Sequence, residues 1–240
     1  MHFTRTIAVA CLAAGALPAL ASNVDQIQTL NQAEFRALSE DLGAALSYKP
    51  LTPTAPLGIT GFDLGLAGTA TKLQNSDALA RAGGGTHSTV GVPSLRLNKG
   101  LPLDIDVGAI AGGIPGTNIR VWGGELRYAL VSGGAAKPAI GIRGSYTKLT
   151  GVDQLELNTK GVDLSISKGF LMLTPYAGVG KVWVASTPVD MPASTPAKES
   201  FSLNKVFVGV NVNLGTMNLV VEGDRTGSAT SYGAKVGFRF

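Results

Sequence analysis

The sequence predicts an all-β chain closed into an antiparallel transmembrane β-barrel of about ten strands, preceded by a short amphipathic helix. Hydrophobic residues make up 45% of the chain and the mean hydropathy is +0.23, yet only 15% of the residues are charged. Beyond residue 21 no apolar run approaches the roughly 20 residues that a membrane helix needs. From residue 57 onward, apolar residues instead alternate with polar or small ones, as they do in lipid-facing strands.

Residues 1–21 have the pattern of a secretory signal peptide. His2 and Arg5 precede an apolar run over residues 7–20, and small residues flank position 20, so we expect cleavage after Ala21. The only cysteine, Cys11, lies inside that run. The exported chain is therefore expected to form no disulfide and to hold no cysteine-ligated metal.

Residues 22–56 are expected to form a helix and a stiff linker. Asn31 and Glu34 have the spacing of a capping box, which predicts a helix start. Prolines at positions 50, 53 and 56 then forbid both a helix and a central strand. The apolar residues that follow helical spacing are Val24, Ile27, Leu30, Phe35, Leu38, Leu42 and Leu46. The polar face is mostly acidic or neutral, which disfavours an anchor on anionic lipid and favours a plug or a periplasmic cap.

Residues 57–240 are expected to form the barrel itself. Alternation extends over segments of about 10 to 13 residues, longer than the 5 to 6 of ordinary sheets and suited to a tilted bilayer crossing. Eight or twelve strands are alternatives, because residues 155–168 and the region around Pro175 can be divided in more than one way. Leu171 and Leu173 are out of phase with Tyr176, Val182 and Val184, which predicts a β-bulge near Pro175.

The connections between these segments alternate in length. The longer ones are expected near residues 73–88, 112–118, 148–154, 185–200 and 223–229, and the shorter ones near 98–102, 131–137, 167–170 and 214–216. Long loops on one side and tight turns on the other are typical of a barrel in an outer membrane. Closure is required because nothing in hydrocarbon can pair the amides of an open sheet edge.

The last nine residues resemble the terminal strand of bacterial outer-membrane β-barrel proteins, which ends in phenylalanine after alternating apolar and aromatic residues. The matching positions are Tyr232, Val236, Phe238 and Phe240. The resemblance implies recognition of this strand by the barrel-assembly machinery. It also implies residence in the cell outer membrane, in contact with its lipid and lipopolysaccharide, and a porin-like general architecture.

Charged residues on the inward face are expected to form a polar network in the lumen. Barrels of eight to ten strands have narrow interiors filled by side chains, and charges there must pair because lone buried charges are costly. We favour a structural interior over a selective pathway. The predicted network is Asp63, Arg96, Asp104, Asp106, Glu125, Arg127, Arg143, Asp163, Lys235 and Arg239.

Two features could carry chemistry instead. Asp104 and Asp106 are expected to share one strand face about 6.5–7 Å apart, a spacing open to acid–base or cation-binding roles. His87, the only histidine after position 2, is followed by Ser88 but has no acidic neighbour in the sequence. Glycine-rich stretches lack phosphate-loop spacing. We therefore expect no catalytic residue, no metal site and no cofactor.

The favoured function is that of a non-enzymatic outer-membrane barrel with a structural or narrow-pore role for small solutes. One alternative is an outer-leaflet lipid-modifying hydrolase that uses His87. Another is an adhesin or receptor that acts through the loops at 73–88 and 185–200. Loss of Arg5 with the signal peptide lowers the net charge from +4 to +3, too small to indicate nucleic-acid binding. The oligomeric state stays open.

Overall fold

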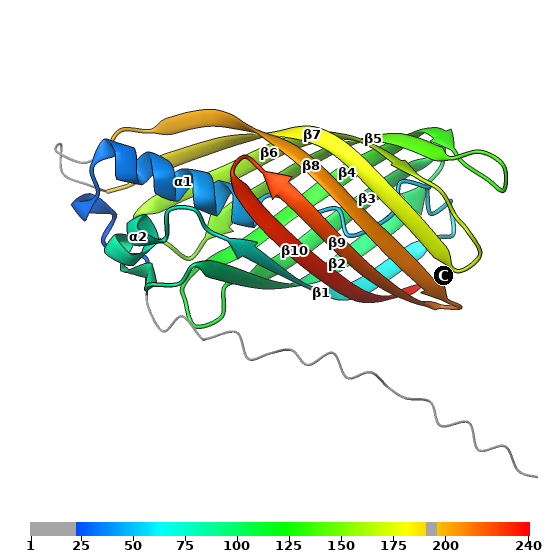
Figure 1. Cartoon of the computed structure of the whole chain (residues 1–240), viewed down its shortest axis with the longest axis horizontal. Helices are drawn as coiled ribbons and strands as arrows, with labels where there is room; N and C mark the ends of the chain where they lie inside the picture. The colour runs from blue at the N-terminus through cyan, green and yellow to red at the C-terminus, as the bar shows by residue number, and fades with distance from the viewer. Residues whose placement is uncertain (1–22, 191–195) are drawn as a thin grey trace, which may run out of the picture.

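A computed structural model describes residues 23–190 and 196–240, in which ten antiparallel strands close into a barrel (Figure 1). The prediction of a closed barrel of about ten strands is confirmed, whereas residues 1–21, the predicted signal peptide, lie outside the described residues. The strands are β1 (Phe62–Lys72), β2 (Thr89–Leu101), β3 (Ile105–Gly113), β4 (Arg120–Ser132), β5 (Ala139–Thr150), β6 (Leu155–Ser167), β7 (Leu173–Pro188), β8 (Glu199–Leu214), β9 (Met217–Thr226) and β10 (Ala229–Arg239).

The first and last strands close the barrel. Strand β1 pairs with β10 from Asp63 opposite Arg239 to Lys72 opposite Thr230, and with β2 on its other side. Every strand thus has two hydrogen-bonded neighbours. A sheet with no free edge is the arrangement that satisfies strand backbones inside a bilayer.

The burial pattern is the reverse of that in a water-soluble barrel. Along β6, buried and exposed residues alternate almost without exception. Leu164 is 49% exposed on the outer surface, whereas its neighbour Asp163 is 1% exposed and faces the interior. Apolar side chains facing outward and polar ones facing inward define a lipid-exposed surface around a polar lumen.

The barrel has two distinct ends. The loop end carries the connections 73–88, 114–119, 151–154, 189–198 and 227–228; the turn end carries 102–104, 133–138, 168–172 and 215–216, with the C-terminus beside them. Short helical segments, η1 (Ile27–Thr29), α2 (Ser76–Leu79) and η2 (Ala80–Gly84), lie at the loop end. The connections 73–88 and 189–198 at the loop end are the longest, as predicted. The connections 133–138 and 168–172 at the turn end are nevertheless longer than 151–154 and 227–228 at the loop end, so the predicted alternation holds only in part.

Helix α1 (Gln32–Leu46) lies inside the loop end of the barrel (Figure 1). Its capping box forms as predicted: the Glu34 backbone N–H donates to the Asn31 side chain, and the Glu34 carboxylate accepts from the Asn31 backbone N–H. No helix among residues 23–190 and 196–240 is long and apolar enough to cross a membrane.

The chain that follows α1 runs through the lumen in extended form. Residues 47–54 are buried without interruption, and the chain reaches the turn end before β1 begins at Phe62. The three prolines predicted to forbid a helix or a central strand lie in this threading segment, defined here as residues 47–57. The lumen is thereby occupied by the chain's own residues from one end to the other.

The predicted bulge near Pro175 is wrong. Strand β7 keeps an unbroken register with β6 and β8, and the register shift occurs in β4 between Ala129 and Val131. The apolar residues along this stretch change phase for another reason. Val182 and Val184 point into the lumen, where they pack against α1. Apolar residues in this half of β7 therefore face inward, which the outward-apolar rule does not allow for.

The placement predicted for Asp104 is also wrong. Strand β3 begins only at Ile105, and Leu103 and Asp104 occupy the turn before it with φ of 65° and 58°. Two successive residues with positive φ are incompatible with a strand and place both residues in the tight turn between β2 and β3. Asp104 is exposed there and accepts a hydrogen bond from Ser132 Oγ at 2.7 Å, so it shares no strand face with Asp106.

Single cysteines at neighbouring positions of β6 give a direct test of the outward and inward faces. A fluorophore on Leu164→Cys should be quenched strongly by lipids that carry a quencher on their acyl chains, because this position faces the bilayer. The same fluorophore on Ser165→Cys, at a buried inward position, should be quenched weakly. Equal quenching at both positions in refolded liposomes would contradict the assigned faces.

Candidate functional site: the occupied lumen

At the loop end the lumen wall is apolar and matches the helix inside it. Phe35, Leu38 and Leu42 of α1 are buried in one cluster with wall residues such as Val90 and Leu157. The helix approaches β7 so closely that a Cβ on Gly43 would lie 2.7 Å from a methyl carbon of Val184. Glycine at position 43 thus permits the helix to sit against the wall.

Polar contacts clasp α1 at the mouth of the barrel. The Asp41 carboxylate accepts the backbone N–H groups of Gln74 at 3.1 Å and Asn75 at 2.7 Å. Burial raises the pKa of the Asp41 carboxyl above its ordinary value, and these N–H donors oppose that rise. Arg36 pairs with Glu199, the first residue of β8, at 3.0 Å, and the Gln32 side chain accepts the backbone N–H of Ala197 at 2.7 Å. The connections 73–88 and 189–198 are therefore both tied to the helix.

The first half of the threading segment is held by its backbone. Lys205 Nζ donates to the Tyr48 carbonyl oxygen at 2.6 Å, and Arg96 Nη1 donates to the Lys49 carbonyl at 2.6 Å. The Leu51 N–H donates to the Glu222 carboxylate at 2.8 Å. Charged wall side chains therefore satisfy backbone groups that have no sheet partner.

The second half is held in the same way. Arg127 Nη1 donates to the Pro53 carbonyl at 2.7 Å, and the Leu57 N–H donates to Asp106 at 3.1 Å. The Thr54 N–H donates to Ser167 Oγ at 3.1 Å. These contacts come from β3, β4 and β6, so the segment is fixed from several sides of the wall.

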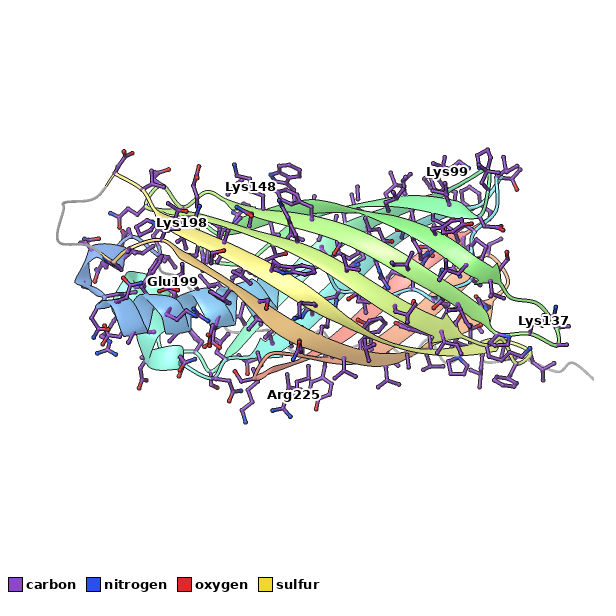
Figure 2. The ribbon with its side chains drawn as sticks, turned by 90° about the horizontal axis from the view of Figure 1, so that it is seen from above. Lys99, Lys137, Lys148, Lys198, Glu199 and Arg225 are labelled. Carbon is purple, nitrogen blue, oxygen red and sulfur yellow. The ribbon has the colours of Figure 1, made fainter. Side chains whose placement is uncertain are left out.

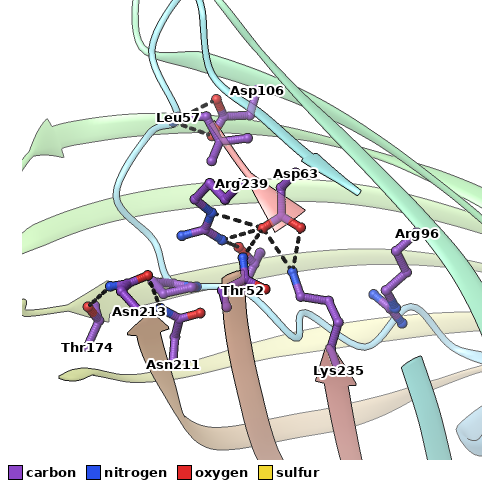
Figure 3. A network of polar contacts seen from close by, with 12 residues as sticks. Thr52, Leu57, Asp63, Arg96, Asp106, Thr174, Asn211, Asn213, Lys235 and Arg239 are labelled. Atoms are coloured by element: carbon purple, nitrogen blue, oxygen red, sulfur yellow. Dashed lines mark hydrogen bonds and ion pairs between the residues drawn. The ribbon is translucent and has the colours of Figure 1, made fainter. Parts of the chain in front are cut away.

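Ion pairs join the wall residues to one another. Asp63 is the centre of one cluster: Lys235 Nζ lies 2.9 Å and Arg239 Nη2 2.5 Å from its carboxylate oxygens (Figure 3). Asn218 Nδ2 donates to the same carboxylate at 2.9 Å. Because Asp63 and Arg239 stand opposite each other across the β1–β10 seam, this cluster also bridges the closure of the barrel.

A second cluster is packed more loosely. Arg143 lies 3.3 Å from Glu125 and 3.6 Å from Asp163, and Lys205 lies 3.5 Å from Asp163. Both oxygens of Asp163 are buried without a hydrogen-bond partner among the described residues. Phe207 lies beside this cluster, with the Lys205 ammonium 5.4 Å from its ring centroid.

Most of the predicted lumen network lies together inside the barrel. Buried wall residues from that prediction are Asp63, Arg96, Asp106, Glu125, Arg127, Arg143, Asp163 and Lys235; Arg239 is partly exposed at the turn end and Asp104 lies outside the lumen. The buried ionisable residues that the prediction missed are Asp41, Tyr48, Lys49, Tyr176, Lys205, Glu222 and Asp224. Lys205, Glu222 and Asp224 alternate with outward residues along their strands, so the period-two pattern could have predicted that they face the lumen. For Lys49 and Tyr48 the sequence contained no such pattern.

His87 lies in the loop end connection and is only partly buried. It forms no hydrogen bond or ion pair with any residue in the described ranges. Those ranges also contain no group of three or more histidine, cysteine or acidic residues placed to hold a metal ion. The residues around His87 thus show no arrangement of base, nucleophile and acid.

Aromatic side chains mark both ends of the outer surface. Trp122 and Tyr146 pack edge-to-face near the loop end with ring centroids 6.1 Å apart. Phe62 and Phe240 stack at the turn end with centroids 5.4 Å apart. Aromatic residues at the two borders of an apolar belt are characteristic of membrane–water interfaces. Tyr232, Val236 and Phe238 also face outward, on strand β10.

A closed antiparallel barrel, an apolar outer belt with aromatic borders and a polar lumen define a small transmembrane β-barrel of the bacterial outer-membrane type. The fold therefore implies residence in the outer membrane. Barrels of this type carry longer loops outside the cell and tight turns in the periplasm, which assigns the loop end to the exterior.

No protein-family model and no curated protein matches the sequence. Among solved structures, the N-terminal β-barrel domain of Pseudomonas aeruginosa OprF is 13% identical, with a TM-score of 0.40; the match covers 76% of this chain and 99% of that domain. The KdgM porin in complex with disordered oligogalacturonate is 8% identical with a TM-score of 0.39, over 74% and 99% of the two chains. Neisserial surface protein A is 10% identical with a TM-score of 0.32, over 75% and 94%.

Removing the charge of Asp63 should destabilise the barrel, because Lys235 and Arg239 would lose their buried counter-charge. We expect Asp63→Asn to lower the free energy of unfolding by about 3 kcal/mol, the usual cost of breaking a buried ion pair. The measurement is urea unfolding in lipid vesicles. Asp104→Asn, the same change at an exposed turn, should shift stability by no more than about 0.5 kcal/mol. Equal losses of stability in the two variants would contradict a structural role for Asp63.

Proposed function

We propose that the protein is a non-enzymatic outer-membrane barrel whose lumen is closed at rest by its own amino-terminal segment, so that it serves as a structural barrel of the cell envelope. The observation that carries this proposal is the uninterrupted burial of residues 47–54 inside the lumen. Hydrogen bonds from Arg96, Arg127 and Lys205 to backbone carbonyls hold that segment in place.

Matched surfaces support a resident plug over a transient one. The helix is apolar where the wall is apolar, and the threading segment presents backbone groups that have no sheet partner where the wall is charged. An apolar helix leaving its half of the lumen would expose wall residues such as Val121 and Leu149 to water. Burial of that apolar surface favours the occupied state.

A narrow pore for small solutes is the second candidate. It is favoured by the mixed charges that line the lumen beneath the segment, among them Arg143, Asp163 and Lys205, which would face water once the segment moved. Selectivity would then depend on the charges at the constriction rather than on the net charge of the chain. In this reading the segment acts as a gate rather than as a permanent plug.

The hydrolase and adhesin hypotheses have less support. A lipid-modifying hydrolase would need a partner for His87, and the described residues supply none by hydrogen bond or ion pair. An adhesin or receptor would act through the connections at the loop end, part of which, residues 191–195, lies outside the described residues.

Planar-bilayer conductance tests the closed state. The full chain should show no steady channel, and deletion of residues 23–48 should raise the single-channel conductance. A deletion of residues 23–56, which also removes most of the threading segment, should raise it further, since the carbonyls held by Arg96 and Arg127 would be gone. A large conductance in the full chain, unchanged by either deletion, would contradict the plug.

A disulfide in the full chain separates a permanent plug from a gate. Ser39 Oγ on α1 lies 2.8 Å from Ser186 Oγ on β7, so Ser39→Cys with Ser186→Cys should form a bond that fixes the helix. Silence in both oxidised and reduced protein supports the structural role. Channels that appear only after reduction support the pore and contradict closure as the resting function. Ser39→Cys alone is the matched control.

A further inference from the structure

Four basic side chains lie on adjacent strands of the outer surface. Arg120 on β4, Lys148 on β5, Lys160 on β6 and Lys181 on β7 all occupy outward positions, between residues that face the lumen. Lys148 lies toward the loop end in Figure 2, whereas Lys99 and Lys137 lie toward the turn end. These four residues are called the basic belt.

The strand register places the basic belt at a nearly constant level along the barrel axis. Paired residues do not stay level, because the strands tilt. The row of pairs that contains Lys72, at the loop end of β1, passes through Val206 on β8. The same row passes through Leu164 on β6 and reaches Ile105 at the turn end of β3. A row followed from β7 to β4 therefore descends toward the turn end.

Each member of the basic belt compensates for this descent. From β7 to β4, each basic residue has a register partner on the next strand. The basic residue of that next strand lies two residues from this partner, on the same outward face and nearer to the loop end. Lys181 is paired with Val162, and Lys160 lies two residues from Val162. Lys160 is paired with Tyr146, and Lys148 lies two residues from Tyr146. Lys148 is paired with Trp122, and Arg120 lies two residues from Trp122. Neighbouring members of the basic belt are one strand spacing apart across the strands and two residues apart along them, so the four positions form a band about 25 Å long.

The basic belt has no acidic counterpart. No carboxylate in the described part of the chain lies within ion-pair distance of Lys148, Lys160 or Lys181, and Arg120 donates only to the backbone carbonyls of its own loop. The outward residues around the belt are aromatic, apolar or uncharged polar: Thr150 is paired with Arg120, Asn158 with Lys148, and Asn204 with Lys181. Trp122 and Tyr146 lie beside it, with Trp183 paired to Lys160. Unpaired cations beside an aromatic border are placed to meet anionic headgroups.

We propose that the basic belt is a binding site for the phosphate groups of an anionic glycolipid in the outer leaflet. The belt lies at the end of the barrel assigned to the cell exterior, where the headgroups of that leaflet lie. A glycolipid with two phosphates on one sugar headgroup matches a band of charges several strands wide better than a phospholipid with one phosphate. Its acyl chains would lie along outward residues such as Ile142, Leu164 and Val179.

Binding can be measured on the refolded full chain with three probes: bis-phosphorylated lipid A, the same glycolipid without its phosphates, and phosphatidylglycerol. Wild type should bind the bis-phosphorylated form most tightly. Lys148→Gln with Lys160→Gln should weaken that binding about thirtyfold, because two headgroup-facing charges are lost. The matched control is Lys137→Gln with Lys198→Gln, which removes the same charge from exposed positions outside the basic belt and should leave affinity unchanged.

Heat-modified gel mobility shows whether each variant is folded before its binding is compared. A folded Lys148→Gln, Lys160→Gln variant that binds bis-phosphorylated lipid A like wild type would overturn the proposal. Equal losses in the belt and control variants would also overturn it, since the effect would then follow net charge alone. Binding of phosphatidylglycerol as tightly as the phosphorylated glycolipid would overturn the choice of ligand. Lys181→Gln alone should weaken the binding about fivefold, because it removes one charge of the belt on β7.

Discussion

The structure depends on one constraint: backbone N–H and C=O groups inside hydrocarbon have no partner except one another. Closure of β1 onto β10 meets that constraint for the strands, and the Asp63 cluster joins the two closing strands from inside. The same constraint applies less strictly in the lumen, where side chains can serve as partners. There the backbone of the threading segment forms hydrogen bonds with arginine, lysine and carboxylate side chains of the wall instead of with a neighbouring strand.

The lumen is divided into two environments by what occupies it. Around α1 the wall is apolar, because a helix satisfies its own backbone and presents side chains. Around the extended segment the wall is charged, because an extended chain presents unpaired amides. The composition of each half of the wall therefore corresponds to the secondary structure it surrounds. Ion pairs between wall strands neutralise those charges where the segment does not reach them.

The period-two pattern was enough to predict the barrel, a strand number of about ten and most of the charged wall, because membrane and lumen impose opposite preferences on successive residues. It failed where a third environment intervened. Val182 and Val184 are apolar and inward because a helix lies against them. Asp104 belongs to a hairpin turn with positive φ, which alternation cannot register. The lumen roles of Tyr48 and Lys49 depend on where the linker runs, and no local pattern specifies that route.

The path of the threading segment restricts the order in which the molecule can be built. Val24 lies at the loop end, while β1 starts at the turn end, so the intervening chain is enclosed by all ten strands. A closed barrel has no lateral opening through which such a segment could enter. Either the seam between β1 and β10 joins around a segment already in position, or the segment passes lengthwise through a finished barrel. In the first order the segment offers contacts to early and late strands alike as the wall closes, since its partners include Arg96 and Arg127 on β2 and β4 and Lys205 and Glu222 on β8 and β9.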